Sequence, residues 1–275
     1  MNKISRPLFA IIAAACAASF ALPSAASEDS VIDEVVERGS LRVGMSSFRP
    51  WVMRNKQGDF IGFEIDVARA LAEDLDVELE LVPTKWDGII PALITGKFDM
   101  IIGGMSINAQ RSLKINFTIP YANSGLEVVV NRSRLPDITS LKQLNDGDIV
   151  IAMRRGVSGA DPVRRLLPDA QLRFFDDEAS CRQEVLNGNA HAWISSLPAP
   201  SDAAADHPDV LYMPLEETFV QSAEAIGLRR GDPDALAFLN GWIATRKASG
   251  WLKERHRHWF RGRDWEAEVA QEEEN

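Results

Sequence analysis

The sequence predicts an α/β protein built as two lobes. Short aliphatic strands alternate with amphipathic helices along most of the 275 residues, an order that is typical of largely parallel sheets covered by helices. The length suits about two domains of ordinary size. We find neither an internal repeat nor a low-complexity linker between the two halves. We therefore expect the chain to pass between the lobes on strands, which favours a cleft between them over two independent domains.

The first half supplies one set of alternating elements. Apolar residues recur at helical spacing after Gly62, at Val67, Leu71 and Leu75, and predict an amphipathic helix there. Residues 98–102 are interpreted as an apolar strand buried on both faces. The other elements predicted in this half are helices at 31–36 and 89–96 and strands at 40–44 and 78–82.

The second half continues the alternation. Its predicted strands lie at 127–130, 148–153, 172–175, 191–194 and 210–213, and its predicted helices at 161–167, 181–186 and 201–205. Aliphatic character resumes at 224–228. Two further amphipathic helices are expected within 233–260, interrupted near Gly250. The chain turns polar from Gly262, where we expect a solvated, mobile tail.

Composition excludes several classes of protein. Hydrophobic residues make up 45% and charged residues 25% of the chain, the mix of a soluble globular protein. Forty acidic and 30 basic residues give a formal net charge of −10, which repels phosphate backbones and argues against non-specific nucleic-acid binding. Two cysteines cannot build a disulfide framework, and they lack the clustered spacing of a zinc site. The four histidines form no metal set, and we expect neither a metal nor a cofactor.

The first 26 residues predict a secretory signal peptide. Lys3 and Arg6 provide a positive start, and an apolar stretch follows at 8–22. Small residues at 23–26 then offer a cleavage site. We therefore expect export, most simply to the periplasm of a two-membrane bacterium.

Two alternatives to cleavage are a retained membrane anchor and a lipid anchor. The apolar run is shorter than the ~20 residues that span a bilayer, and acids follow at 28–29. Residues 13–15 lack the large aliphatic side chain that is usual three positions before a lipid-modified cysteine, which argues against Cys16. Cleavage would leave Cys181 as the only cysteine and permit no intramolecular disulfide.

One segment identifies a family. Gly62-Phe-Glu-Ile-Asp-Val-Ala-Arg-Ala-Leu-Ala-Glu-Asp-Leu75 resembles the signature of family 3 of the bacterial extracellular solute-binding proteins, which serve ABC importers of polar amino acids. Every residue class that the signature expects is present. The resemblance covers residues 31–260 and is densest at 38–131. Further matches, in the family's order, are Phe48-Arg-Pro-Trp51, Trp86-Asp-Gly-Ile-Ile-Pro-Ala-Leu93, Gly96-Lys-Phe-Asp99, Gly104-Met-Ser-Ile-Asn-Ala-Gln-Arg111 and Asn116-Phe-Thr-Ile-Pro-Tyr121.

The resemblance implies a two-lobed periplasmic-binding-protein fold of type II. Two α/β lobes are joined by two crossing hinge strands, and the ligand is held in the cleft between the lobes. Transferred to this chain, the first lobe would comprise 27–131 and 220–275, and the second 132–219. Closure around a ligand is a hinge motion, and the membrane permease of the importer recognises the closed form.

Arg111 is the first site residue that the resemblance implies. In the family an arginine five positions after a Ser or Thr holds the ligand's α-carboxylate, and the pair here is Ser106 and Arg111. A guanidinium offers a planar pair of donors matched to a carboxylate. Ser106 can add its hydroxyl and backbone N–H, and Gly104 lets its backbone carbonyl approach an ammonium group closely. From residue type alone, Arg111 could instead lie on a helix surface and Gly104 could serve only a tight turn.

Aromatic residues and a second loop complete the implied site. Phe48 and Trp86 match positions that sandwich the ligand's aliphatic part in the family, although either ring could belong to the core. Both are predicted in loops after strands, where open α/β sheets bind ligands. Arg155-Gly-Val-Ser158 resembles the loop whose Gly and Ser or Thr donate to the ligand carboxylate, so Ser158 is a candidate. Arg154 and Arg155 could face solvent or add positive potential to the cleft.

Departures from the family bear on the ligand. Many members carry an acid for the ligand ammonium after the strand that matches 190–194, and alignment on Gly188 puts Ser196 there. An unpaired ammonium in a dry cleft is costly. Either Ser196, another acid such as Glu178, or water compensates, or the ligand has no ammonium. The loop before Phe48 also lacks the acid used by binders of cationic amino acids, so an anionic or uncharged small carboxylate fits better.

The sequence therefore predicts a periplasmic binding protein that captures an amino acid or similar small carboxylate and delivers it to an ABC permease. We expect it to be a monomer and to catalyse no reaction. The alternative is an enzyme of the cyclohexadienyl or arogenate dehydratase type, which the chain also resembles and which needs a general acid. Such enzymes are expected to carry a glutamate just after the second-lobe loop. Here Gly156-Val-Ser-Gly-Ala160 contains no acid, and Asp161 follows.

A sensor or cell-wall enzyme module built on the same fold is a third possibility. Such modules usually need an additional membrane or catalytic domain, which no segment of the sequence up to Asn275 suggests. Neither a Ser/His/Asp arrangement nor a phosphate-binding glycine loop is visible.

Overall fold

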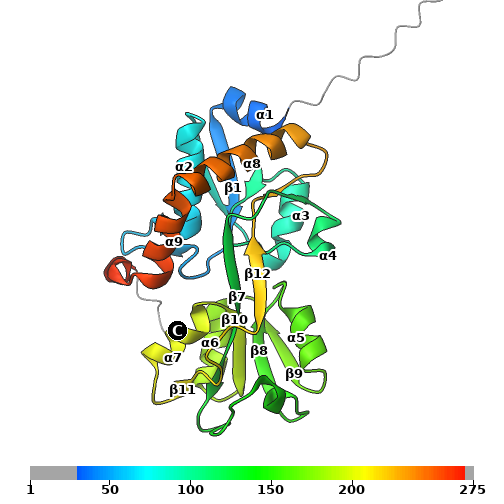
Figure 1. Cartoon of the computed structure of the whole chain (residues 1–275), viewed down its shortest axis with the longest axis vertical. Coiled ribbons are helices and arrows are strands. Elements are labelled where there is room, and N and C mark those ends of the chain that lie inside the picture. Colours follow the sequence, from blue (N-terminus) through cyan, green and yellow to red (C-terminus); the bar gives the residue numbers. More distant parts are fainter. Residues whose placement is uncertain (1–29, 270–275) are drawn as a thin grey trace, which may run out of the picture.

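The computed structural model describes residues 30–269 and shows two α/β lobes joined by a pair of strands (Figure 1). β7 (Ala122–Asn131) and β12 (Val220–Glu224) pair antiparallel and run side by side from one lobe into the other. The predicted two-lobed α/β fold is therefore confirmed, with strands rather than a linker making the crossing. The predicted signal peptide lies outside the described residues.

The upper lobe in Figure 1 is built on a five-stranded sheet with the order β4-β1-β5-β13-β6. β1 is parallel to β4 and β5, whereas β13 is antiparallel to β5 and β6. These strands are β1 (Ser40–Met45), β4 (Glu78–Pro83), β5 (Met100–Ile101), β6 (Asn116–Phe117) and β13 (Gly227–Leu228). A separate ribbon pairs β2 (Met53–Arg54) with β3 (Phe60–Ile61).

Helices cover both faces of this sheet. They are α1 (Val31–Arg38), α2 (Phe63–Asp74), α3 (Ile89–Ile94), α4 (Ala109–Ser112), α8 (Pro233–Ala248) and α9 (Trp251–Arg261), with 3-10 turns η1 (Trp86–Gly88) and η3 (Asp264–Glu268). The amphipathic pattern of α2 behaves as predicted, because Val67 and Leu71 are fully buried. Among residues 30–269, no helix is both long enough and apolar enough to cross a bilayer.

The lower lobe has a six-stranded sheet in which β11-β7-β10-β8-β9 are neighbours and β12 pairs with β7. β8, β9 and β10 are parallel, and β7 is antiparallel to β10, β11 and β12. The remaining strands are β8 (Val150–Arg154), β9 (Gln171–Phe175), β10 (Ala192–Ser196) and β11 (Leu211–Tyr212). The helical segments are η2 (Leu141–Leu144), α5 (Ala160–Leu166), α6 (Glu178–Leu186) and α7 (Ala199–Asp206).

The strand predicted at 98–102 is shorter than expected. The segment is buried, as predicted, but only Met100 and Ile101 form β5. Asp99 interrupts the apolar run, and its buried carboxylate accepts hydrogen bonds from the guanidinium groups of Arg38 and Arg42 and from the backbone N–H of Arg42. The segment therefore bonds to its neighbour partly through a side chain.

The mobile tail predicted from Gly262 is wrong for the part that the structure describes. Trp265 in η3 is 4% exposed, and its ring centroid lies 5.6 Å from that of Trp259. The guanidinium carbon of Arg49 lies over the ring of Trp265, 4.9 Å from its centroid. This buried indole anchors the segment to the upper lobe.

The acids of the family signature stabilise the upper lobe. Glu64 is fully buried and accepts a 2.6 Å hydrogen bond from the hydroxyl of Tyr121. Burial raises the pKa of Glu64 to about 8, so its carboxyl is mostly protonated at neutral pH. Asp66 accepts a 2.7 Å bond from the indole N–H of Trp259 and ties α9 to α2. Both acids of the segment thus bond to side chains from other parts of the upper lobe.

Candidate functional site

The predicted site residues meet in a narrow cleft between the lobes. Every one of them lines it: Phe48, Trp86, Gly104, Ser106 and Arg111 from one side, and Ser158 and Ser196 from the other. Gly103, Arg154, Val157 and Glu178 complete the lining. The cavity measures about 30 Å³, which leaves room for only a few water molecules. The lobes are thus closed, and the roles of these residues toward a ligand stay predictions.

Arg111 is held in the cleft by the turn that precedes it. Asn108 caps α4 by accepting the backbone N–H of Arg111 at 2.8 Å. The guanidinium then turns back, donating from Nη1 to the carbonyl of Ser106 at 2.7 Å and from Nη2 to the carbonyl of Gly156 at 3.1 Å. The side chain is buried, and the second bond crosses between the lobes. The cap and the carbonyl bonds fix where its charge is presented.

The charge of Arg111 is not cancelled by its hydrogen-bond partners. Burial lowers its pKa to about 10, and the nearby carboxylate of Glu224 acts in the opposite direction. The guanidinium is therefore still protonated at neutral pH. A buried cation whose bonds go to neutral carbonyls is suited to receive an anionic group.

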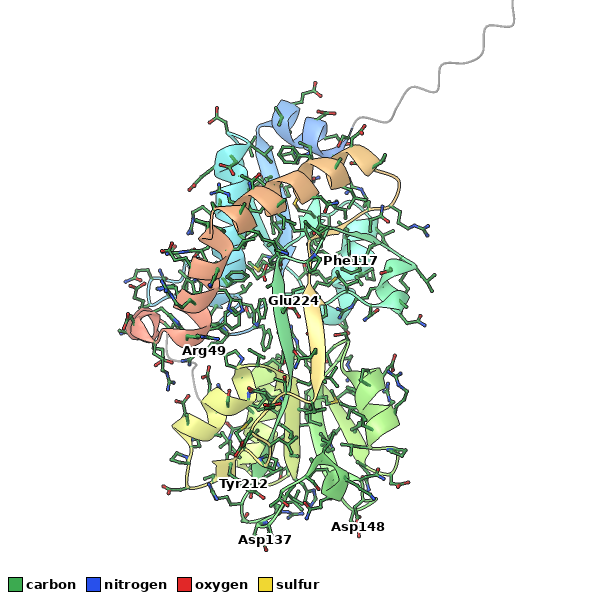
Figure 2. All side chains as sticks on the ribbon, viewed as in Figure 1. Arg49, Phe117, Asp137, Asp148, Tyr212 and Glu224 are labelled. Atoms are coloured by element: carbon green, nitrogen blue, oxygen red, sulfur yellow. The ribbon has the colours of Figure 1, made fainter. Side chains whose placement is uncertain are left out.

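Glu224 links this site to the strands that join the lobes. It ends β12, near the middle of the molecule in Figure 2, and is 1% exposed. Its Oε1 accepts from the hydroxyls of Ser222 at 2.8 Å, Ser124 at 3.0 Å and Ser106 at 3.4 Å. Burial raises its pKa. Sequence reasoning missed Glu224, whose only signal was that a single acid opens the aliphatic stretch at 224–228.

Arg154 enters the cleft from the lower lobe. It ends β8 and is 5% exposed. Its Nη2 donates to the hydroxyl of Ser46 in the upper lobe at 2.5 Å. The guanidinium carbons of Arg154 and Arg111 lie 5.5 Å and 5.7 Å from the ring centroid of Trp86, within the range of cation–π interaction. Of the two arginines that the sequence left open, Arg154 therefore faces the cleft, whereas Arg155 is exposed.

The aromatic side of the cleft rests on Trp51. Phe48 is half-buried and stacks on Trp51 with the planes 8° apart. Gly104 has a φ of +68°, and a Cβ there would lie 3.1 Å from the Trp51 ring. Glycine is therefore required for both backbone conformation and space. Trp51 itself is 1% exposed, as expected for a residue that packs beneath the loop.

Among the described residues that line the cleft, one carries a carboxyl group, Glu178. This residue begins α6, is half-buried, and accepts a 3.0 Å hydrogen bond from the hydroxyl of Ser195. Burial raises the pKa of Glu178 to about 7, while the positive charge of Arg154 opposes this rise. Ser196, the neighbour of Ser195 at the end of β10, lines the same cleft. The structure thus places an acid near the position that the sequence left without one.

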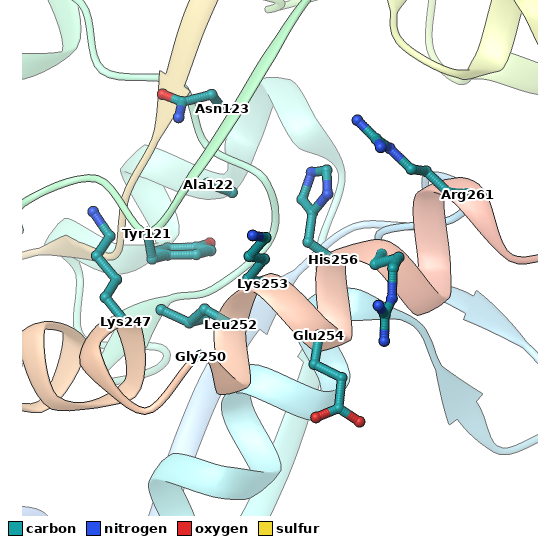
Figure 3. A pocket seen from close by; sticks show the side chains of 11 residues that line it. Tyr121, Ala122, Asn123, Lys247, Gly250, Leu252, Lys253, Glu254, His256 and Arg261 are labelled. Carbon is teal, nitrogen blue, oxygen red and sulfur yellow. The ribbon is translucent and has the colours of Figure 1, made fainter.

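A larger hollow of about 660 Å³ lies elsewhere, on the upper lobe beside the start of β7 (Figure 3). The side chains of Lys247, Lys253 and His256 line this hollow together with Tyr121. Both lysines are exposed. None of the predicted site residues lines this hollow, and all of its lining comes from residues 121–123 and 247–261. Its larger size does not make it the site, because the convergent buried polar groups lie in the cleft.

A closed two-lobed α/β protein with a polar cleft at its strand-linked centre is a type II periplasmic binding protein. The family model of bacterial extracellular solute-binding proteins, family 3, matches residues 41–262. The chain belongs to this family.

Curated relatives include both binding proteins and an enzyme. The L-cystine-binding protein TcyJ of Escherichia coli K12 is 28% identical over 92% of this chain and 94% of its own length. Cyclohexadienyl dehydratase of Pseudomonas aeruginosa is 27% identical over 90% of this chain and 92% of its own. Membership of the family therefore leaves catalysis open.

Solved structures agree on the fold. A binding component of an ABC transporter from Wolinella succinogenes, complexed with lysine, superposes with a TM-score of 0.78 at 37% identity, covering 84% of this chain and 100% of that one. The ancestral amino acid-binding protein AncCDT-1, a precursor of cyclohexadienyl dehydratase, gives a TM-score of 0.76 at 35% identity with the same coverage. Both structures are similar to this chain along their whole length.

Proposed function

We propose that this protein captures an amino acid, or a similar small carboxylate, in the cleft and delivers it to the permease of an ABC importer. The carrying observation is the buried Arg111 guanidinium, which faces the cleft with neutral hydrogen-bond partners. The relatives that bind amino acids support the ligand class. The proposal includes export to the periplasm, a monomeric state, and ligand contacts by Phe48, Trp86, Gly104, Ser106, Arg111, Ser158 and Ser196.

The proposed division into lobes follows the crossing strands. The first lobe takes residues 27–131 and 220–275, and the second takes 132–219. The course of β7 and β12 between the lobes supports a division near these boundaries. Because residues 126–131 pair with β10 and β11 of the lower sheet, the crossing is expected within β7 rather than at its end. Ligand exchange then requires the lobes to separate about these strands.

The second candidate function is a dehydratase, and one observation favours it. Glu178 is a cleft carboxyl whose pKa lies near 7, a value suited to a general acid. Asp161, the acid that follows the second-lobe loop, is exposed and bonded to Arg164 at 3.0 Å. We propose binding without catalysis, because Asp161 is absent from the lining of the narrow cleft, lies instead in the adjoining hollow beside Ser158, and bonds to Arg164.

A binding screen tests the function. The purified protein, unfolded and refolded to remove bound ligand, is mixed with the twenty standard amino acids, L-cystine, small dicarboxylates, prephenate and arogenate. We expect one class of amino acid to raise the melting temperature, since a ligand at 100 times its Kd stabilises by about 2.7 kcal/mol. Product formation from prephenate or arogenate would establish the dehydratase instead.

Arg111→Ala should abolish the shift, while Arg155→Ala serves as the matched control. Both substitutions remove an arginine near the loop at 155–158, but Arg155 is exposed and bonds outward to Asp176. Equal ligand affinity in the wild type and in Arg111→Ala would contradict the proposed site.

A further inference from the structure

We propose that the cleft selects an amino acid that carries a second anionic group, which Arg154 binds. The inference rests on the proposed function and names its ligand class. The expected ligand has two carboxylates, or a carboxylate and another acid, and one ammonium. Aspartate and glutamate are the simplest members of this class.

The charges that line the cleft support this choice. Arg111 and Arg154 approach from opposite lobes and lie over the same Trp86 ring, whereas Glu178 is the one acid in the lining. Within residues 30–269, neither arginine has a carboxylate oxygen within 4.0 Å. Glu224 acts on Arg111 and Glu178 acts on Arg154 through space, but neither acid forms a direct ion pair with its arginine. A ligand with one carboxylate would engage one guanidinium and leave the other buried without a direct ionic partner, which is less favourable. A ligand with two anionic groups engages both.

Arg154 also has unused donor capacity. Arg154 is 5% exposed, and its Nε–H donor has no hydrogen-bond partner among the described residues. A contact from Nη1 to the carbonyl of Ser47 is long, at 3.4 Å. Buried donors are nearly always satisfied in folded proteins, so Arg154 keeps donor capacity that the described residues do not satisfy.

Acids outside the lining do not fill this role. Asp87 and Asp177 act on Arg154 only through space, and Asp177 is engaged as the cap of α6, accepting the backbone N–H of Ser180 at 2.7 Å. Glu178 lines the cleft, accepts from Ser195, and is the acid that acts most strongly on Arg154 through space. Its position also suits it to face the ligand's ammonium. The arrangement accommodates two negative groups and one positive group.

Paired ligands that differ in one charge provide the test. L-glutamate and L-glutamine have nearly the same shape, as do L-aspartate and L-asparagine. We expect the wild type to bind the acid of the preferred pair about 10- to 100-fold more tightly than its amide, the range for a hydrogen bond to a charged group. In Arg154→Gln this ratio should fall to within about threefold, mainly through weaker binding of the acid.

Ser46→Ala is the control for a purely structural role. It removes the partner of Arg154 in the opposite lobe but keeps the guanidinium. A weakened closure should lower the affinities for acid and amide by the same factor, so their ratio stays at the wild-type value. Arg154→Lys keeps the charge and should retain at least part of the ratio.

Several results would overturn the inference. Tighter binding of L-glutamine, L-asparagine, L-lysine or L-arginine than of both acids would contradict it and leave amino acid capture intact. An acid-to-amide ratio unchanged by Arg154→Gln would do the same. Binding of none of the amino acids, or turnover of prephenate or arogenate, would contradict the proposed function itself and this inference with it.

Discussion

At the scale of single residues, the closed cleft is organised by buried charges. Arg111 and Arg154 bond to carbonyl and hydroxyl oxygens, and burial lowers the pKa of both. Neutral acceptors satisfy part of each guanidinium without cancelling its charge. Burying these charges lowers the stability of the closed lobes, and a ligand carboxylate that pairs with them restores part of that free energy. Such a site holds its guanidinium groups in fixed positions and still attracts an anionic ligand strongly.

Glu178 gives the site a pH dependence. Burial raises its pKa to about 7, and the groups that act on it are Arg154, Asp177, Ser195 and Trp193. A ligand ammonium stabilises the ionised carboxylate and so lowers this pKa on binding. Below pH 7 the free protein must release a proton to bind, so affinity should fall as the pH drops from 8 to 5.5, by up to about tenfold per unit.

Isothermal titration at several pH values measures this effect. Glu178→Gln, which keeps an oxygen to accept from Ser195, should bind more weakly at pH 8 and lose the dependence near pH 7. An affinity that is constant from pH 5.5 to 8 in the wild type would show that Glu178 does not face an ammonium.

At the scale of elements, η3 carries a prediction that the sequence did not suggest. Trp265 is buried against Trp259 and Arg49. Trp265→Ala should lower the free energy of unfolding by about 3 kcal/mol, in line with large-to-small substitutions in cores. Glu268→Ala in the same segment should change it by less than about 0.5 kcal/mol, because that side chain is exposed. Urea denaturation measures both, and equal values would mean that η3 is not part of the folded unit.

The same elements show where sequence reasoning works and where it stops. The helix after Gly62 and the break near Gly250 followed from periodicity and a helix-breaking residue, both local properties. The residues that the motif matches implied meet in one cleft because most of them lie at or shortly after the carboxyl ends of strands, as Phe48, Gly104 and Ser196 do. Local patterns therefore carried most of the fold and most of the cleft.

The features that the sequence did not predict depend on contacts between residues far apart in the chain. β5 begins after Asp99, whose side chain bonds to arginines about 60 positions earlier in the chain, and no local pattern predicts that pairing. Trp265 is one apolar residue in a polar stretch and has no periodic neighbours. The position of Arg154 depends on how the lobes close, and that of Glu224 on contacts with Ser106 and Ser124, which lie more than 90 positions earlier in the chain; no local signal in the sequence encodes either.

At the scale of the whole molecule, closure brings backbones of opposite lobes together at Gly156. A Cβ on this residue would lie 3.1 Å from the Cα of Asp87, and its φ of +78° already favours glycine. The carbonyl of Gly156 accepts from Arg111 across the same gap. Gly156→Ala should therefore hold the lobes apart, because a backbone atom cannot move aside as a flexible side chain can.

Gly250→Ala is a closely matched control. Gly250 has the same φ of +78°, and no atom lies within 4 Å of the position that its Cβ would take. Both substitutions should cost stability by about 1 to 2 kcal/mol through backbone strain. Only Gly156→Ala should raise the radius of gyration in small-angle X-ray scattering and weaken ligand binding by at least about tenfold, since a cleft that cannot close offers a ligand only one lobe. If both variants scatter and bind like the wild type, the contact between Gly156 and Asp87 does not limit closure, and ligand capture does not depend on lobes packed this tightly.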